Sequence, residues 1–414
     1  MSCEAYAYPI TTGEKPELYP ASMLDENVGD YEEYFSVESQ YDSIIEIREL
    51  PDTDGFYNAA VLYLNGVHYL LGRQVGKAGS ENEPDVGSLV LKTLDDDGNI
   101  IHYEEVWNPN TGNGDREYLL EDARALTLSD GRAAIGLTYV TREGVDSIPH
   151  PAVLIVNSIE RLKKVFDDNA VKCLGKIAIK QAFAGQSPNQ EAIGEQTTPI
   201  SESINETNIT PIGKNVIAIS SRKSLEEDNK HTYSFAFRPE GNINNHRLHV
   251  FEHSEDGEVD HRQFIDFPKD IPWAEFRIGT TVPPIWLNEN EAIFPIHGST
   301  LVNGKYVYSI GTTRLLRDKD GNLSVDNISQ ESVINPDLFD GMFDGDKVEL
   351  HPERRVVYCC GGIPIYDNSG KYNHLKLYVN VGDKRTVEVT MSMAEMVKNW
   401  DRGEYTGLEL PIVA

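Results

Sequence analysis

Two carboxylates and an arginine stand close together in the segment Glu121-Asp122-Ala123-Arg124. In a strand, residues two apart point to the same face, so the sequence predicts that Asp122 and Arg124 lie side by side. Such a pairing would keep the Asp122 carboxyl ionised or hold it against a substrate hydroxyl. The alternative is a salt bridge that only caps a strand.

A second group of reactive side chains follows further along the chain. Arg277-Ile-Gly-Thr-Thr-Val-Pro-Pro-Ile285 precedes His297, and Tyr308 comes shortly after. Thr-Val-Pro-Pro cannot be the interior of a central strand, because proline has no N–H to donate, so a rigid entry at a channel mouth is expected. An arginine, a histidine and a tyrosine that converge on one pocket would bind an anion through charge-assisted hydrogen bonds. Each of the three, taken alone, can equally be structural.

The elements that would position these groups recur five times, each as an apolar strand, a tight turn and a second apolar strand. The repeats begin at Asn58, Asp122, Asn208, Thr281 and Lys347, roughly 65 to 85 residues apart. The turns Asn65-Gly66 and Asp130-Gly131 predict hairpins in which both central residues have positive φ. Five units predict an all-β fold, a five-bladed β-propeller, which brings the first strand of every blade to one central pocket.

The rest of the chain is expected to add little to this domain. Residues 1–44 form an irregular N-terminal extension, residues 45–400 the propeller, and residues 401–414 a C-terminal tail. Ser392 with Glu395 makes a capping box, which predicts a short C-terminal helix. The polar stretch 181–206 is expected to be a long inserted loop.

Composition restricts the partners. The formal net charge of −30 argues against nucleic acid, whose phosphates would be repelled; the charge favours solubility, with adaptation to high salt as the alternative. No secretory signal or membrane span is visible, so a cytoplasmic protein without a membrane partner is expected. Cys359 and Cys360 are expected to be buried and reduced, and no metal cluster has convincing ligand spacing. A homo-oligomer is left open.

The order of these motifs resembles glycoside hydrolase family 130, the β-mannoside phosphorylases and hydrolases, over residues 45–400. The family's EDPR-type motif is similar to Glu121–Arg124, with Ala123 in place of proline. Its KIGxGxPPI and YHG motifs resemble Arg277–Ile285 and Ile296–Gly298, and its YxxGxxLLD motif resembles Tyr308–Asp318. Its final LYYGAAD resembles Leu377-Tyr-Val-Asn-Val-Gly-Asp383.

The resemblance implies a role for each matching residue. Asp122 would be the general acid, delivering its proton through a hydroxyl of the bound mannose. The sugar before the scissile bond would be held by Asn58, Arg73, Arg124 and Asp383. The phosphate pocket would be formed by Arg222, Arg277, His297 and Tyr308. The resemblance implies no cofactor, only inorganic phosphate as co-substrate, and a small oligosaccharide or mannose 1-phosphate as partner.

One departure from the family pattern leaves two mechanisms open. Where the phosphorylases carry a basic residue near the start of the third repeat, this chain has Ile204-Asn-Glu-Thr-Asn208. Glu206 would repel phosphate but could activate water as the base of an inverting hydrolase. The four retained phosphate positions favour phosphorolysis of β-mannosides, expected to be β-1,2-linked, with inversion to α-mannose 1-phosphate. The alternatives are an inverting β-mannosidase that uses Glu206, and a carbohydrate-binding propeller without catalysis.

Overall fold

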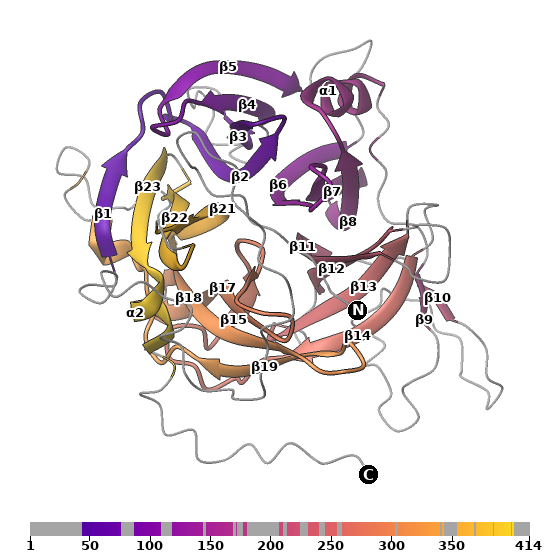
Figure 1. Cartoon of the computed structure of the whole chain (residues 1–414), viewed down its shortest axis with the longest axis vertical. Coiled ribbons are helices and arrows are strands. Elements are labelled where there is room, and N and C mark those ends of the chain that lie inside the picture. The colour runs from indigo at the N-terminus through magenta and orange to yellow at the C-terminus, as the bar shows by residue number, and fades with distance from the viewer. Residues whose placement is uncertain are drawn as a thin grey trace.

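The chain is described by a computed structural model in which five β-sheets form the predicted five-bladed propeller. The described residues are 44–75, 87–108, 118–143, 146–168, 171, 177–179, 207–209, 213–223, 231–239, 245–254, 259–302, 305–339, 342, 354–367, 370–383, 385–398 and 400. Figure 1 shows the sheets around a common centre, with β2, β6, β11 and β21 facing it. The predicted fold class is therefore confirmed.

Each blade is built mainly from consecutive antiparallel strands. The first has β2 (Phe56–Leu64), β3 (Val67–Gln74), β4 (Ser88–Leu94) and β5 (Ile100–Trp107). The second has β6 (Tyr118–Thr127), β7 (Ala133–Glu143) and β8 (Asp146–Val156). The third has β11 (Gly213–Lys223), β12 (His231–Pro239), β13 (Arg247–Ser254) and β14 (Val259–Asp266), with β9 (Ile177–Ile179) and β10 (Thr207–Ile209) beyond β14.

The fourth blade has β15 (Arg277–Thr280), β16 (Ile285–Trp286), β17 (Glu291–Val302), β18 (Lys305–Arg317), β19 (Leu323–Ile328) and β20 (Arg354–Arg355). The fifth has β21 (Val357–Tyr366), β22 (Tyr372–Val381) and β23 (Arg385–Ser392), and β1 (Ile44–Glu49) completes it. The helices are α1 (Ile159–Asp167), α2 (Met393–Lys398) and the 3₁₀ turn Pro336–Phe339. The predicted C-terminal helix is confirmed by α2, which begins directly after Ser392.

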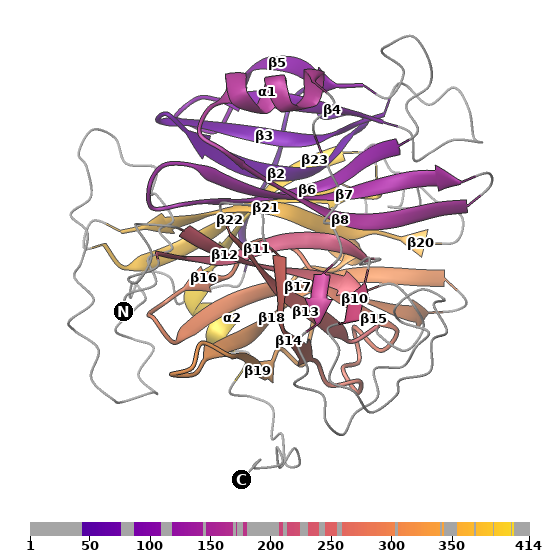
Figure 2. The same cartoon turned by 90° about the vertical axis from the view of Figure 1, so that its right-hand side faces the viewer.

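The inner strands of different blades meet at the axis, which is what places a common site there. Strand β2 contacts β6 and β21, and β11 contacts β6 and β15. Seen edge-on in Figure 2, the strands run from one face of the disc to the other. Residues near the beginnings of β2, β6 and β11 therefore gather toward one end of the central channel.

The first strand of the described chain closes the ring. Strand β1 pairs antiparallel with β23, from Ile44 opposite Met391 to Glu49 opposite Val387. Arg48 binds Glu388 of β23 at 2.8 Å and also donates to the backbone oxygen of Gly98 in the first blade. The last blade is thus completed by the beginning of the propeller and tied to its neighbour.

One of the two predicted hairpin turns has the expected geometry. Asn65 and Gly66 have φ values of 54° and 83°, so both adopt the left-handed conformation. In the second turn Gly131 has a φ of 82°, but Asp130 does not have a positive φ. That turn is one residue longer than expected: the Gly131 N–H binds the Leu128 oxygen at 2.9 Å, and only the glycine adopts the left-handed conformation.

The later repeats are shifted from their predicted positions. The third hairpin is β11–β12, so its inner strand begins at Gly213, whereas Thr207–Ile209 forms β10 at the other edge of that sheet. The fourth blade begins with β15, before Thr281, and the fifth hairpin is β21–β22. Apolar alternation marks strands but not their place in the sheet, which explains the shift.

The proline-containing segment lies at the channel, as predicted, and is not a strand. It separates β15 from β16 because proline cannot donate to the ladder. Val282, Pro283 and Pro284 line a cavity of about 80 Å³ together with Val61 and Ala125 of two inner strands. The segment therefore helps to close the channel.

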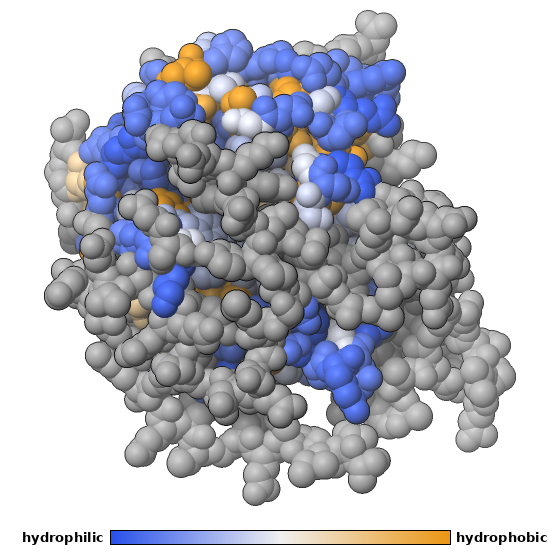
Figure 3. All heavy atoms as spheres, in the orientation of Figure 1, coloured by the Kyte–Doolittle hydropathy of each residue, from blue (hydrophilic) through white to orange (hydrophobic). Residues whose placement is uncertain are grey.

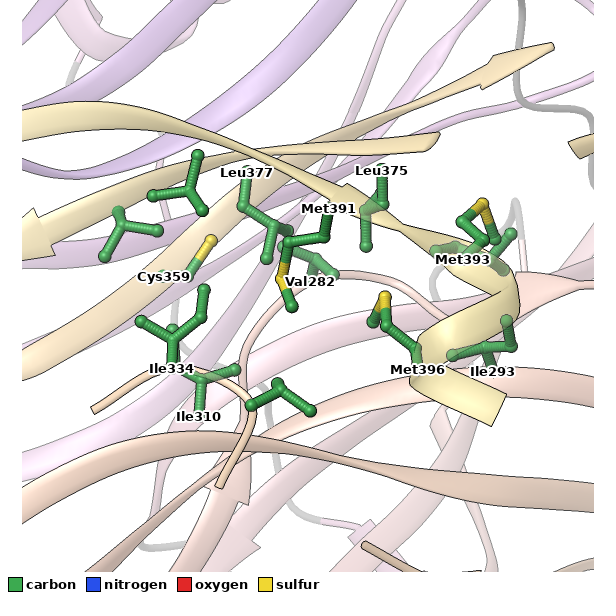
Figure 4. Packing of buried hydrophobic residues seen from close by; sticks show 14 of the residues in the cluster. Val282, Ile293, Ile310, Ile334, Cys359, Leu375, Leu377, Met391, Met393 and Met396 are labelled. Carbon is green, nitrogen blue, oxygen red and sulfur yellow. The ribbon is translucent and has the colours of Figure 1, made fainter. Parts of the chain in front are cut away.

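Apolar packing between blades holds the disc together. One large described cluster joins the fourth and fifth blades with α2, as Figure 4 shows for Ile293, Ile310, Leu375, Met393 and Met396. Cys359 belongs to this cluster, and both Cys359 and Cys360 are free thiols that are fully buried. The expectation for these two cysteines is confirmed.

On the face seen in Figure 3, the described surface is largely hydrophilic. Figure 3 shows mainly blue residues over the first two blades, with a few apolar residues among them. Among the described residues, the helices are all too short or too polar to cross a membrane.

Candidate active site

Three inner strands carry a polar residue in the left-handed conformation at the same place near their start. Asn58, Asp122 and Asn215 have φ values of 54°, 52° and 59°. At each one the pairing register shifts, between Tyr57 and Ala60 in β2 and likewise in β6 and β11. Asparagine and aspartate tolerate this conformation better than other non-glycine residues. The bulges therefore repeat around the axis and interrupt the strand alternation at the site.

The predicted sugar-binding residues meet around Asp122. Asn58 Nδ2 donates to Asp122 Oδ1 at 2.7 Å, and Arg73 Nη1 lies 3.8 Å from the same oxygen. Arg73 Nη2 also lies 3.4 Å from Glu121 Oε1. The Asp122 side chain keeps 14% of its surface exposed. The described contacts of the Asp122 carboxyl thus gather at its Oδ1 atom.

The predicted pairing of Arg124 with the Asp122 carboxyl is wrong. Arg124 is fully buried, and its Nη1 donates to the backbone oxygen of Asp122 at 2.8 Å. The bulge at Asp122 breaks the two-residue alternation on which the prediction depended. The arginine beside the carboxyl is Arg73, from the first blade.

Asp383 joins this group through a residue that the sequence analysis missed. Asn380, at the end of β22, donates from Nδ2 to Asp383 Oδ1 at 2.8 Å and to Asn58 Oδ1 at 3.2 Å. Asp383 also has a left-handed backbone, with a φ of 57°. The signal available in the sequence was an asparagine inside the apolar strand Leu377–Val381, where a polar side chain needs a partner.

The second predicted group lies at the beginning of the fourth blade. Arg277, Ser299 and Tyr308 are direct partners across β15, β17 and β18. His297 lies two residues from Ser299, on the same face and opposite Gly279. The predicted residues Arg277, His297 and Tyr308 are thus brought to one face of one sheet.

His297 is held in one tautomer by the backbone. Its Nδ1 lies 3.0 Å from the Thr280 oxygen, and because a carbonyl only accepts, Nδ1 carries the proton. Burial lowers the pKa of His297 well below 6.5, and the charges of Arg238, Arg124 and Arg277 lower it further. His297 is therefore neutral at neutral pH and leaves Nε2 as an acceptor.

Close packing at Gly279 sets the place of this ring. A Cβ atom there would lie 2.3 Å from His297 Cε1 and 2.7 Å from Asn215 Nδ2. These distances are shorter than any ordinary contact, so only glycine leaves room for both side chains.

A buried hydrogen-bond network connects the two groups. Arg124 Nη2 donates to Asn215 Oδ1 at 3.1 Å and to the Tyr358 hydroxyl, which itself donates to Asn215 Oδ1 at 2.8 Å. The Tyr358 and His297 rings are 4.4 Å apart. Burial raises the pKa of Tyr358 well above 10, so its hydroxyl remains a donor. Tyr308 packs against the small apolar cluster that contains Tyr358.

Arg238 is the cation that sequence analysis missed. It lies on β12, only 4% exposed, and its charge acts on both His297 and Tyr358. Lys214, at the start of β11, is its direct partner across the strands. An arginine at the end of the apolar run Tyr233–Phe237 was a usable signal, because a buried arginine requires a reason. The start of the third inner strand is therefore basic.

For two predicted residues the structure describes no side chain. Glu206 lies outside the described residues. Arg222 lies on β11, opposite Thr232, but its side chain is outside the described part of the chain. Among the described residues, no group of three or more His, Cys, Asp or Glu side chains could hold a metal ion.

Comparison with known proteins identifies solved structures that share this fold. No family model matches the chain, and no curated protein matches it either. A glycosyl hydrolase from Bacteroides ovatus superposes with a TM-score of 0.53 at 14% identity, over 85% of this chain and 91% of that chain. The β-1,2-mannobiose phosphorylase of Listeria innocua, solved with β-1,2-mannobiose, superposes with a TM-score of 0.52 at 16% identity, over 87% and 99%. The chain has the fold of these proteins, in agreement with the predicted resemblance.

Proposed function

We propose that this protein is a glycoside phosphorylase acting on β-mannosides, with β-1,2-mannobiose as the first substrate to test. The observation that carries the proposal is that hydrogen bonds and a ring contact through Arg124, Asn215 and Tyr358 connect Asp122 to the buried His297 ring, on which the charges of Arg238 and Arg277 also act. A carboxyl donor next to an anion pocket is what phosphorolysis of a glycosidic bond requires. The name of the Listeria innocua neighbour supports the choice of linkage.

The sugar would bind between Asn58, Arg73 and Asp383, with its anomeric carbon toward the anion pocket. Asp122 would supply the proton that the departing sugar oxygen needs, through a hydroxyl of the bound mannose. Phosphate would attack the anomeric carbon from the opposite face, so a single displacement inverts the configuration and gives α-mannose 1-phosphate. The proton lost by the phosphate balances the proton that Asp122 donates.

The pocket suits a phosphate that still carries one proton. Arg124, Arg238 and Arg277 supply positive charge. The Nη atoms of Arg124 already bind Asp122, Asn215 and Tyr358, so the Arg277 fork is the one that would match phosphate oxygens. His297 Nε2, left as an acceptor, can bind the hydroxyl of monohydrogen phosphate. A water nucleophile has no need of three cations.

Hydrolysis by Glu206 has weaker support in the described part of the chain. The third inner strand begins at Gly213 with Lys214 and Asn215, and Lys214 pairs with Arg238. Lys214 would then be the counterpart of the basic residue that the resemblance implies in the third repeat. The described residues therefore favour phosphate over water.

The test is to incubate the protein with β-1,2-mannobiose in the presence and absence of inorganic phosphate. We expect α-mannose 1-phosphate and mannose in equal amounts, formed only when phosphate is present. Free mannose released at the same rate without phosphate would contradict phosphorolysis and support the hydrolase. Mannose 1-phosphate and mannose supplied together should give the reverse reaction.

Asp122→Asn is the matched variant for this assay. Turnover should fall by roughly 10²- to 10⁴-fold, the usual contribution of a general acid, while mannobiose still binds. Binding measured by calorimetry distinguishes the remaining alternative. If both the unaltered protein and the variant bind mannobiose without turnover, the protein is a carbohydrate-binding propeller.

A further inference from the structure

Asn380 carries a buried amide at the candidate active site. It lies on β22, is 1% exposed, and stands where the LYYGAAD pattern has glycine. Among the described atoms its Oδ1 is buried and has no hydrogen-bond partner. An unpaired buried oxygen costs free energy, so the orientation of this amide must be set by its Nδ2 atom.

The Nδ2 atom lies in the middle of a hydrogen-bonded row of four side chains at the site. Asp122 Oδ1 accepts from Asn58 Nδ2 at 2.7 Å. Asn58 Oδ1 accepts from Asn380 Nδ2 at 3.2 Å, and the same Nδ2 donates to Asp383 Oδ1 at 2.8 Å. This row of side chains begins and ends at a carboxyl group.

The two carboxyl groups at its ends fix the donor-to-acceptor direction of the hydrogen bonds along this row. An ionised Asp383 can only accept, so Asn380 must turn Nδ2 toward it. The second N–H of that group then meets Asn58, which must present Oδ1 to Asn380 and Nδ2 to Asp122. Rotating either amide by half a turn would place two hydrogen-bond acceptors against each other: Asn380 Oδ1 against Asp383, or Asn58 Oδ1 against Asp122.

The direction decides where Asp122 carries its proton. Asn58 donates to Oδ1, and Arg73 lies on the same oxygen at 3.8 Å. A proton on Oδ1 would face these donors, so the acid form carries it on Oδ2. Without Asn380 the Asn58 amide could turn over and accept a proton from Oδ1, which would leave Oδ2 bare.

We propose that Asn380 is a positioning residue that keeps the proton of Asp122 on Oδ2, the oxygen directed to the substrate. The inference rests on the proposed function, in that Asp122 must protonate the leaving sugar. As the bond from the anomeric carbon to the glycosidic oxygen breaks, that oxygen takes the electron pair and the proton from Oδ2, relayed by a sugar hydroxyl. Asp122 becomes the carboxylate until the attacking phosphate returns a proton.

The experiment compares two leaving groups in Asn380→Ala. With β-1,2-mannobiose the leaving sugar must be protonated, and we expect kcat to fall about 10- to 100-fold, part of the contribution of a general acid. With 2,4-dinitrophenyl β-mannoside the leaving group needs no proton, so kcat should stay within about 3-fold of the unaltered protein. Asn380→Leu, which keeps the branched heavy-atom shape but not the donor, should behave in the same way.

Each other outcome contradicts the inference. Equal losses with both substrates would mean that Asn380 places the sugar and not the proton. Unaltered rates in either variant would mean that its amide is not needed. Asn290→Ala, at an exposed position, is the control and should change neither rate. A thermal unfolding curve for every variant confirms that it is folded. If the unaltered protein cleaves neither substrate, the proposed function has failed, and this inference fails with it.

Discussion

At the scale of single residues, the site depends on side chains held in unusual backbone conformations. Asn58, Asp122, Asn215 and Asp383 all have positive φ, and three of them lie at strand bulges. Such conformations cost free energy and persist where the surrounding structure enforces them. Here buried hydrogen bonds do so, and the result is a carboxyl group and an anion pocket placed next to each other.

Gly279→Ala tests the anion pocket at this scale. The added methyl group would meet His297 and Asn215 at distances below 3 Å, so His297 must move away from the arginines. Overpacking of this kind costs about 1–3 kcal/mol, and we expect the KM for phosphate to rise about tenfold. Steady-state rates at varied phosphate concentration provide the measurement.

Gly362→Ala is the control for that variant. A Cβ there meets the side chain of Leu377 at 2.9 Å, in the apolar part of β21 and β22. It should lower the thermal midpoint without changing the phosphate KM. A Gly279→Ala protein with an unaltered phosphate KM would show that His297 takes no part in phosphate binding.

At the scale of elements, β1 closes the ring and links two blades. Glu388, 3% exposed, binds Arg48 at 2.8 Å and Lys376 at 3.2 Å. Arg48 also donates to Gly98 and Asn99 of the first blade. The sequence pattern indicates that the propeller starts near this strand but not that the strand pairs in the last blade. Pairing between the two ends of a chain leaves no local pattern.

Arg48→Ala tests this closure. The variant leaves Glu388 with Lys376 as its remaining described cation and removes the Arg48 hydrogen bonds to Gly98 and Asn99 of the first blade. We expect the free energy of unfolding to fall by about 1–3 kcal/mol, measured by chemical denaturation. Arg247→Ala removes an exposed ion pair with Asp266 inside one blade and should cost less than about 1 kcal/mol. Equal losses in the two variants would contradict a special role for β1.

At the scale of the whole molecule, several buried or half-buried histidines are kept in the neutral form. Burial lowers the pKa of His68 to about 4, and it lowers the pKa of His246, His253 and His297 as well. The unfolded chain takes up these protons below about pH 6.5, and the folded chain does not. Stability is therefore lost as the pH falls from about 6.5.

His68→Asn tests the contribution of one of these groups. Between about pH 7 and about pH 5 the unaltered protein should lose about 1–2 kcal/mol more stability than the variant, since each pKa unit is worth about 1.4 kcal/mol. Denaturant unfolding at the two pH values measures the difference. The same pH dependence in both proteins would show that His68 is protonated in the fold.

The sequence by itself determined the five blades and most residues of the candidate site. Alternating apolar strands and the turn Asn65-Gly66 are local patterns, and the fold confirms them. The motifs around Asp122 and Arg277 are also local, and they named residues that the structure brings together. What only the tertiary structure decided lies between blades. The bulge at Asp122 turned Arg124 away from the carboxyl and brought Arg73 to it, and the shift of the third hairpin placed Lys214 and Asn215 at the axis. The physical reason is that period-two alternation specifies which face a residue takes along a straight strand. Ring closure and bulges decide which side chains from different blades meet, as Asn58 of the first blade meets Asn380 of the neighbouring fifth blade.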